Sequence, residues 1–164
     1  MDRIYERSFD LNEWFIIISL LALLIVIWIT PKIFPFLEGL SYFIYGIAIG
    51  MFYDHTISIP PWDFYDVNDS SAYQAIDFIS YIMYGPYSYF FIYIYKKLKI
   101  RGVMNLAYLL VWTSFSLLME WFTLKIGFFH FDKGYEMYWS IPIYMAVQSI
   151  QLLFHHRIKR VTNG

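Results

Sequence analysis

Five apolar segments, each long enough to cross a bilayer as an α-helix, constrain the fold of this chain most strongly. They cover residues 14–30, 36–53, 75–95, 103–126 and 137–155. A spanning helix needs about 17–25 mostly apolar residues. The chain is 59% hydrophobic and only 15% charged, whereas a soluble domain is about 45–50% apolar and 25% charged. We therefore predict an all-α fold, a single domain over 1–164 that forms an integral membrane bundle of five transmembrane helices.

The first segment, 14–30, is predicted to be a retained helix and not a cleaved signal peptide. A signal peptide begins with a basic region and ends at a small-residue cleavage site. Here "TPKIFP" follows the segment, and acids outnumber bases before it: Asp2, Glu6, Asp10 and Glu13 against Arg3 and Arg7. Ser19 is the only polar residue in its middle, so we expect this helix at the periphery of the bundle.

The basic residues predict the orientation. With five spans, one side of the membrane receives eight bases: Lys32, Lys96, Lys97, Lys99, Arg101, Arg157, Lys159 and Arg160. The other side receives four: Arg3, Arg7, Lys125 and Lys133. Because basic residues are retained in the cytoplasm, we predict the N-terminus outside and the C-terminus inside. Nearly all the acids then fall on the outer side, with Glu38 as the clear exception.

Polar side chains recur at three- and four-residue spacing on three of the predicted helices, so each set lies on one helix face. Such faces satisfy hydrogen bonds that lipid cannot, and in the second helix Gly46 and Gly50 form a small-xxx-small pair that permits close approach. The sets are Asp77, Tyr81, Tyr84 and Ser88; Thr113, Ser116, Glu120 and Thr123; and Ser140, Tyr144, Gln148, Gln151 and His155.

Glu120 is the least expected residue, because it interrupts an apolar run that is otherwise typical of a transmembrane helix. An acid within a membrane helix costs about 2.5–3.5 kcal/mol and usually faces a cavity or a partner. We expect Glu120 to point inward, toward the third helix. Asp54, Asp77 and Glu120 come from three helices at similar depths and could meet in the outer leaflet, and their convergence is left open. The loops over 54–74 and 127–136 are predicted to roof this cluster. The candidate pocket contains Asp54, His55, Asp77, Tyr81, Tyr84, Glu120, His130 and Tyr144.

Three kinds of chemistry compete for this cluster. The first is a cation or metal site, but no H-x-x-H or H-E-x-x-H spacing supports one, and no metal ligand is assigned. The second is a buried acid–base pair for proton-coupled chemistry on a lipid-like substrate. The third is a structural acid that fixes helix register. No cysteine is present, no catalytic residue or cofactor is identified, and no nucleic-acid signature appears.

Three classes of function remain open from the sequence. The leading prediction is a membrane protein that binds a small ligand, a lipid headgroup or a cation in an acidic outer-leaflet pocket. The alternatives are a small membrane-embedded enzyme acting on a lipid or isoprenoid substrate, and a structural scaffold or accessory subunit. The lipid bilayer is the expected partner. A membrane-protein partner or a second copy of the chain is left open.

Three stretches carry a resemblance: "GMFYDHTISIPPWDFYDVND", "YGPYSYFFIYIYKKL" and "MEWFTLKIGFFHFDKGYEMYWSIPIY". Over roughly residues 36–155 the chain resembles a family of small uncharacterised multi-pass membrane proteins from spore-forming Gram-positive bacteria. The features that carry the likeness are Asp54, the tyrosine-rich third helix, Glu120-Trp121 and the segment from Trp139 to Tyr144. The resemblance implies a membrane bundle in a bacterial cell membrane, and it implies no reaction.

Overall fold

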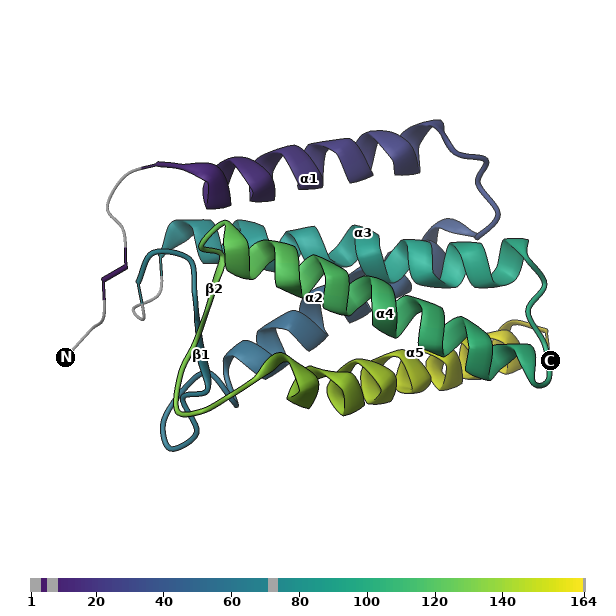
Figure 1. Cartoon of the computed structure of the whole chain (residues 1–164). Helices are drawn as coiled ribbons and strands as arrows, with labels where there is room; N and C mark the ends of the chain where they lie inside the picture. Colours follow the sequence, from purple (N-terminus) through teal and green to yellow (C-terminus); the bar gives the residue numbers. More distant parts are fainter. Residues whose placement is uncertain (1–3, 6–8, 71–73, 164) are drawn as a thin grey trace.

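The computed structural model describes residues 4–5, 9–70 and 74–163. This part of the chain is mostly helical, as predicted, and its five α-helices run back and forth in chain order (Figure 1). The helices are α1 (Leu11–Ile29), α2 (Phe36–Asp54), α3 (Ala75–Lys97), α4 (Met104–Lys125) and α5 (Ser140–Asn163). The most extensive contact is between α2 and α3, and α4 pairs with α5. Helix α1 contacts mainly α3, which agrees with the peripheral position expected for it.

Helices α1 and α5 differ most from their predicted bounds. Helix α1 starts at Leu11, three residues early, because Asp10 and Glu13 form a reciprocal capping box on its first turn. Helix α5 begins at Ser140 after a single 3-10 turn, η1 (Met137–Trp139), and continues to Asn163. The basic end of α5 therefore remains helical beyond His155, where the apolar pattern ends, and Lys159 there pairs with Glu38 of α2.

The all-α prediction missed a small antiparallel sheet. Strands β1 (Tyr65–Val67) and β2 (Phe129–Phe131) pair across the two long loops, with Asp66 opposite His130. The sheet crosses one end of the bundle, beside the start of α3 (Figure 1). Strands of three residues are too short for an alternating pattern to be recognised in sequence, so only the tertiary contact between the loops reveals them.

Three helices among the described residues, α1, α2 and α4, are long and apolar enough to cross a membrane. Helix α3 has the length, but its tyrosines lower its mean hydropathy, and it lies in the middle of the bundle where its side chains are largely buried. Helix α5 is equally long and ends in a charged segment. The exposed surface of α1 is apolar, with Trp28 80% and Leu11 68% exposed.

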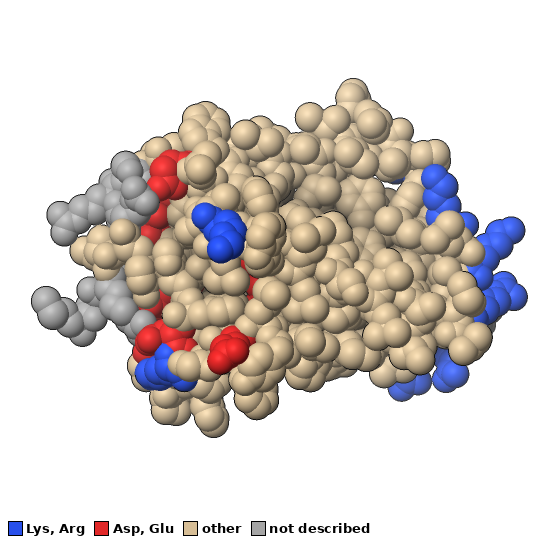
Figure 2. Space-filling model, viewed as in Figure 1, with Lys and Arg blue, Asp and Glu red and all other residues tan. Residues whose placement is uncertain are grey.

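Charge is segregated between the two ends of the bundle (Figure 2). What we call the basic end carries Lys32, Lys96, Lys97, Lys99, Arg101, Arg157, Lys159 and Arg160. What we call the acidic end is formed by the start of α1, the end of α4 and the two loops with β1 and β2, and it carries Asp10, Asp63, Asp66, Asp69, Asp132 and Glu136, together with Lys125 and Lys133. Arg3 and Arg7, which entered the charge count, lie outside the described residues. The surface between the two ends is almost free of charge in this view.

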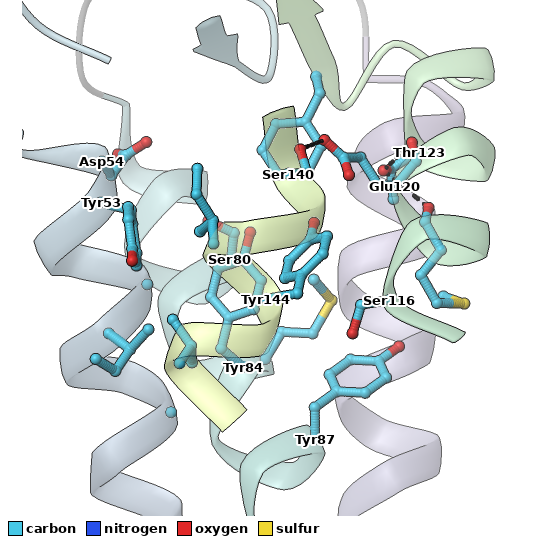
Figure 3. A pocket seen from close by; sticks show the side chains of 18 of the residues that line it. Tyr53, Asp54, Ser80, Tyr84, Tyr87, Ser116, Glu120, Thr123, Ser140 and Tyr144 are labelled. Atoms are coloured by element: carbon cyan, nitrogen blue, oxygen red, sulfur yellow. Dashed lines mark hydrogen bonds between the residues drawn. The ribbon is translucent and has the colours of Figure 1, made fainter. Parts of the chain in front are cut away.

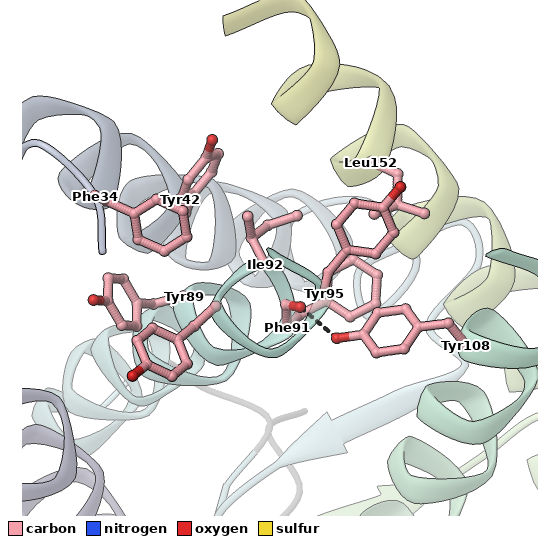
Figure 4. Packing of buried hydrophobic residues seen from close by; sticks show 9 residues of the cluster. Phe34, Tyr42, Tyr89, Phe91, Ile92, Tyr95, Tyr108 and Leu152 are labelled. Carbon is pink, nitrogen blue, oxygen red and sulfur yellow. Dashed lines mark hydrogen bonds between the residues drawn. The ribbon is translucent and has the colours of Figure 1, made fainter. Parts of the chain in front are cut away.

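An aromatic core fills the half of the bundle toward the basic end (Figure 4). Tyr42 and Ile92 are completely buried there. Two tyrosine hydroxyls in this core have partners, since Tyr108 donates to the carbonyl of Phe91 and Tyr95 donates to Asn105, whereas the Tyr93 hydroxyl is buried without one. This half is therefore solidly packed, and the open space in the bundle lies toward the acidic end.

The predicted close approach at Gly46 and Gly50 is confirmed. A Cβ atom added at Gly46 would lie 2.3 Å from the carbonyl oxygen of Tyr84, and one at Gly50 would lie 2.5 Å from the Tyr84 ring. Next to this contact, Ser88 donates to the carbonyl of Tyr42, and Gln151 of α5 donates to the Ser88 hydroxyl at 2.7 Å. The polar faces of α3 and α5 thus tie three helices together.

Candidate functional site

A cavity of about 260 Å³ lies between the helices, in the half of the bundle toward the acidic end. All five helices and both strands contribute to its wall, in which tyrosine and phenylalanine are the most frequent residues. Two carboxylates, Asp54 and Glu120, also line it. Figure 3 shows them on opposite sides of the cavity, with Tyr84 and Tyr144 between them.

Asp54 is the last residue of α2, and only 6% of its surface is exposed. Tyr81 of α3 donates a hydrogen bond to its Oδ2, and Ser58 donates to its Oδ1 at 3.3 Å. These two donors are neutral. The carboxylate is therefore solvated by hydroxyl groups, and no described lysine or arginine forms an ion pair with it.

Glu120 is 5% exposed; its Oε1 accepts a hydrogen bond from the Ser140 hydroxyl at 2.5 Å, and the Tyr144 hydroxyl also interacts with the carboxylate. Because Ser140 donates its only proton to Glu120, the Tyr135 hydroxyl must donate to Ser140, over 2.9 Å. The second carboxylate oxygen, Oε2, is buried with no hydrogen-bond partner. Tyr144 lies beside this carboxylate (Figure 3).

The expected direction of Glu120 is partly wrong. The side chain points inward, but its partner Ser140 is on α5 and not on α3. The other polar residues on this face of α4 also contact α5. The Thr113 hydroxyl donates to the side-chain oxygen of Gln148, and the Gln148 amide donates to the Ser116 hydroxyl. Helices α4 and α5 follow one another in the chain and pack against each other, so the polar face of α4 meets α5.

The two long loops roof the cavity at the acidic end, as expected. Tyr65 and Val67 of β1, with Phe129 and Phe131 of β2, are part of the cavity wall. Side chains alternate along a strand, so Asp66 and His130 face the other way. His130 stacks on the Tyr5 ring at 3.8 Å, and the Tyr5 hydroxyl donates to Asp66. Thus His130, an expected pocket residue, lies on the outer face of the roof.

Two further expected residues, His55 and Asp77, also lie outside the cavity wall. His55 is exposed just beyond α2, with its Nδ1 2.8 Å from the Met51 carbonyl oxygen. Asp77 accepts hydrogen bonds from the Gln74 backbone and the Asn68 side chain, and so caps the start of α3. The structure does not bring Asp77 to the cavity with Asp54 and Glu120, because its carboxylate accepts from the backbone N–H of the N-cap residue Gln74 in a capping box.

The structure places the other five expected residues around the cavity: Asp54, Tyr81, Tyr84, Glu120 and Tyr144. Five tyrosines that also line it were not among the expected residues: Tyr45, Tyr53, Tyr65, Tyr87 and Tyr135. Burial raises the pKa of Tyr65 and of Tyr135, so both remain neutral phenols able to donate. The aromatic character of the two loops was the available signal for these two residues.

The cavity is acidic and has no internal counter-charge. Its wall contains no lysine, arginine or histidine among the described residues. The described part of the chain also holds no group of three or more His, Cys, Asp or Glu side chains arranged to bind a metal ion. The chemistry available is hydrogen bonding from hydroxyls, contact with aromatic faces, and two carboxylates.

No protein-family model, curated protein or solved structure matches the chain. The class defined by the fold is a helical bundle with candidate membrane spans and an internal cavity. The proposal for its function rests on the chemistry of that cavity.

Proposed function

We propose that this is a five-span membrane protein that binds a small ligand in the cavity beneath the roof, in the outer half of the bilayer. The observation that carries the proposal is a cavity of about 260 Å³ lined by aromatic rings, tyrosine hydroxyls and two buried carboxylates, with no lysine, arginine or histidine among its described lining residues. Ligand sites are typically concave, mostly apolar, and equipped with a few polar groups.

Connectivity supports five spans. Helix α2 ends at the acidic end and α4 begins at the basic end, so α3 must travel the full distance between them. Its 23 residues cover about 35 Å at 1.5 Å per residue, and a bilayer core is about 30 Å thick. Helix α5 packs antiparallel along α4 over a similar length. If α2 and α4 span, α3 and α5 span with them.

The segregation of charge supports an orientation with the basic end in the cytoplasm. The N-terminus and the roofed cavity then face outward, and the C-terminus faces inward. We propose a bacterial cell membrane as the location, in line with the resemblance described above.

Cysteine labelling tests this topology, since the chain has no native cysteine. We expect an impermeant maleimide to label Glu136→Cys in intact cells and Lys97→Cys only after permeabilisation. Both positions are exposed at the surface, so access to the reagent is decided by the membrane. Labelling of Lys97→Cys in intact cells would reverse the orientation.

Binding is favoured over the two alternatives by the surroundings of Glu120. An acid–base enzyme needs a base next to the acid, whereas the hydrogen-bonding neighbours of Glu120 are neutral hydroxyls. A scaffold would leave its buried polar atoms satisfied, whereas Oε2 of Glu120 has no partner. An open cavity beside an unsatisfied carboxylate suits a protein that holds a ligand.

The test is to find a bound molecule and to displace it by filling the cavity. Ser116 lines the cavity from α4 (Figure 3), and Ser116→Phe places a ring inside it. We expect native mass spectrometry of the protein, purified in mild detergent, to detect a bound small molecule that is absent from Ser116→Phe. The matched control is Ser114→Phe, two residues away on an exposed face. An equal mass for wild type and Ser116→Phe, after correction for the substitution, would contradict the proposal.

Substitutions of Glu120 separate its structural role from its role in binding. Glu120→Ala removes the acceptor of Ser140, and we expect a loss of about 1–3 kcal/mol in the free energy of unfolding. Glu120→Gln keeps an acceptor for Ser140, so we expect near wild-type stability in mixed-micelle unfolding. Equal destabilisation by both substitutions would show that the carboxylate charge itself holds the fold together.

A further inference from the structure

We propose that the cavity recognises an organic ammonium group, carried either by a lipid headgroup or by a free amine. This inference rests on the proposed ligand-binding function and specifies the chemical class of the ligand. The two carboxylates are the first argument for it. Asp54 and Glu120 are 6% and 5% exposed, line the same cavity, and have no ion pair among the described residues.

A buried carboxylate without a counter-charge is costly. The cavity wall supplies no cation from lysine, arginine or histidine within the described residues. A cationic ligand between the two carboxylates would provide the missing charge. An anionic ligand would add to the repulsion, and the same wall offers it no positive group.

The unsatisfied atom at Glu120 is the second, independent observation. Oε1 already accepts from Ser140, whereas Oε2 is buried without a partner at hydrogen-bonding geometry, although the Tyr144 hydroxyl lies beside the carboxylate. Such an atom calls for a donor. An ammonium N–H would supply one directly, and a quaternary ammonium would supply electrostatic contact in its place.

The aromatic wall favours an organic cation over a metal ion. The faces of tyrosine rings attract cations, most strongly when both are desolvated, and groups of such rings recognise quaternary ammonium ligands. Tyr84 and Tyr144 lie between the two carboxylates (Figure 3). A metal ion needs several converging oxygen or nitrogen ligands, and no such group of acids and histidines exists in the described chain.

The size of the cavity limits the ligand. Its volume of about 260 Å³ is just below the range of roughly 300–1,000 Å³ typical of pockets for drug-sized ligands. A headgroup-sized cation fits this space. A complete lipid does not, so the acyl chains of an aminolipid would have to leave the bundle between the helices.

The test compares a cation with its neutral isostere. Benzyltrimethylammonium and neopentylbenzene have the same shape, and they differ in the charge at one atom. With the protein in nanodiscs of phosphatidylglycerol, which carries no amine, we expect benzyltrimethylammonium to bind at least about tenfold more tightly than neopentylbenzene. Equal affinity for the two probes would overturn the inference while leaving a ligand-binding cavity intact.

Two substitutions test whether the carboxylates cause the preference for the cation over its neutral isostere. We expect Glu120→Gln and Asp54→Asn each to lower the affinity for benzyltrimethylammonium by about tenfold, with little change for neopentylbenzene. The control is Asp63→Asn, an acid at the same end that lies outside the cavity wall. Unchanged cation affinity in both carboxylate variants would overturn the inference.

A second arm identifies the source of the ammonium group. If the natural ligand is a lipid headgroup, phosphatidylethanolamine in the nanodisc will compete with benzyltrimethylammonium. If the natural ligand is a free amine, the affinity will be the same in both lipids. Both results support ammonium recognition. If neither probe binds the wild-type protein any better than it binds Ser116→Phe, both the proposed function and this inference are wrong.

Discussion

Replacement of Lys159 with methionine is expected to lower the free energy of unfolding by about 3–5 kcal/mol. Lys159 of α5 and Glu38 of α2 form an ion pair at 2.9 Å, in which the Glu38 side chain is only 4% exposed. Methionine retains much of the lysine's volume but none of its charge, so the buried carboxylate loses its counter-ion. The measurement is unfolding in mixed micelles.

Lys96 is the nearest basic residue that could compensate, but it is already engaged. Its ammonium donates to the Ile33 carbonyl at 2.6 Å and lies 4.6 Å from the centre of the Phe34 ring. Glu38 in turn accepts from Tyr42, whose hydroxyl also contacts His155 at 2.6 Å. The ion pair is therefore one part of a buried polar network that joins α2 to α5.

A double-mutant cycle tests this account. Glu38→Gln removes the charge but keeps an acceptor for Tyr42, so we expect a smaller loss, about 1–3 kcal/mol. The double variant Glu38→Gln, Lys159→Met has no unpaired charge and should recover most of the stability lost in Lys159→Met. If the two losses simply add, the pair is not coupled and the explanation is wrong.

The second large effect is expected at Gly46, where α2 and α3 touch through their backbones. A Cβ at this position would lie 2.3 Å from the Tyr84 carbonyl oxygen and 2.6 Å from the Ser88 Cβ. Neither atom can rotate away, so the helices must separate. We expect Gly46→Ala to cost about 1–3 kcal/mol, and Gly46→Leu to abolish a monodisperse peak in size-exclusion chromatography.

Two other glycines provide graded controls. At Gly50 the added Cβ would meet the Tyr84 ring at 2.5 Å, and at Gly39 it would meet the Tyr89 ring at 3.2 Å. Rings can move where backbone cannot, so we expect Gly39→Ala to be the mildest substitution and Gly50→Ala to be intermediate. Because Tyr84 lines the cavity, Gly50→Ala should also weaken ligand binding. A stability order in which Gly46→Ala is the mildest would contradict the backbone contact.

The sequence by itself determined the helices, since each is encoded by a continuous apolar run that needs no distant partner. It also determined the polar faces and the close approach at Gly46, because helical periodicity places residues three and four apart on one side. The segregation of bases and acids between the ends follows from their order along an antiparallel chain. These are local properties, and the structure has them as expected.

The tertiary structure alone decided which of the acids share a cavity. The sequence placed Asp77 and Glu120 at similar depths, but depth along a helix does not specify the neighbour that a side chain meets. Asp77 accepts a hydrogen bond from the Gln74 backbone N–H at the start of α3, and Glu120 accepts one from the Ser140 hydroxyl of α5. The pairing of β1 with β2 places the His130 side chain on the face of the sheet that points away from the cavity. Contacts between distant segments select one arrangement among several that the local pattern permits, and the candidate site is made from those contacts.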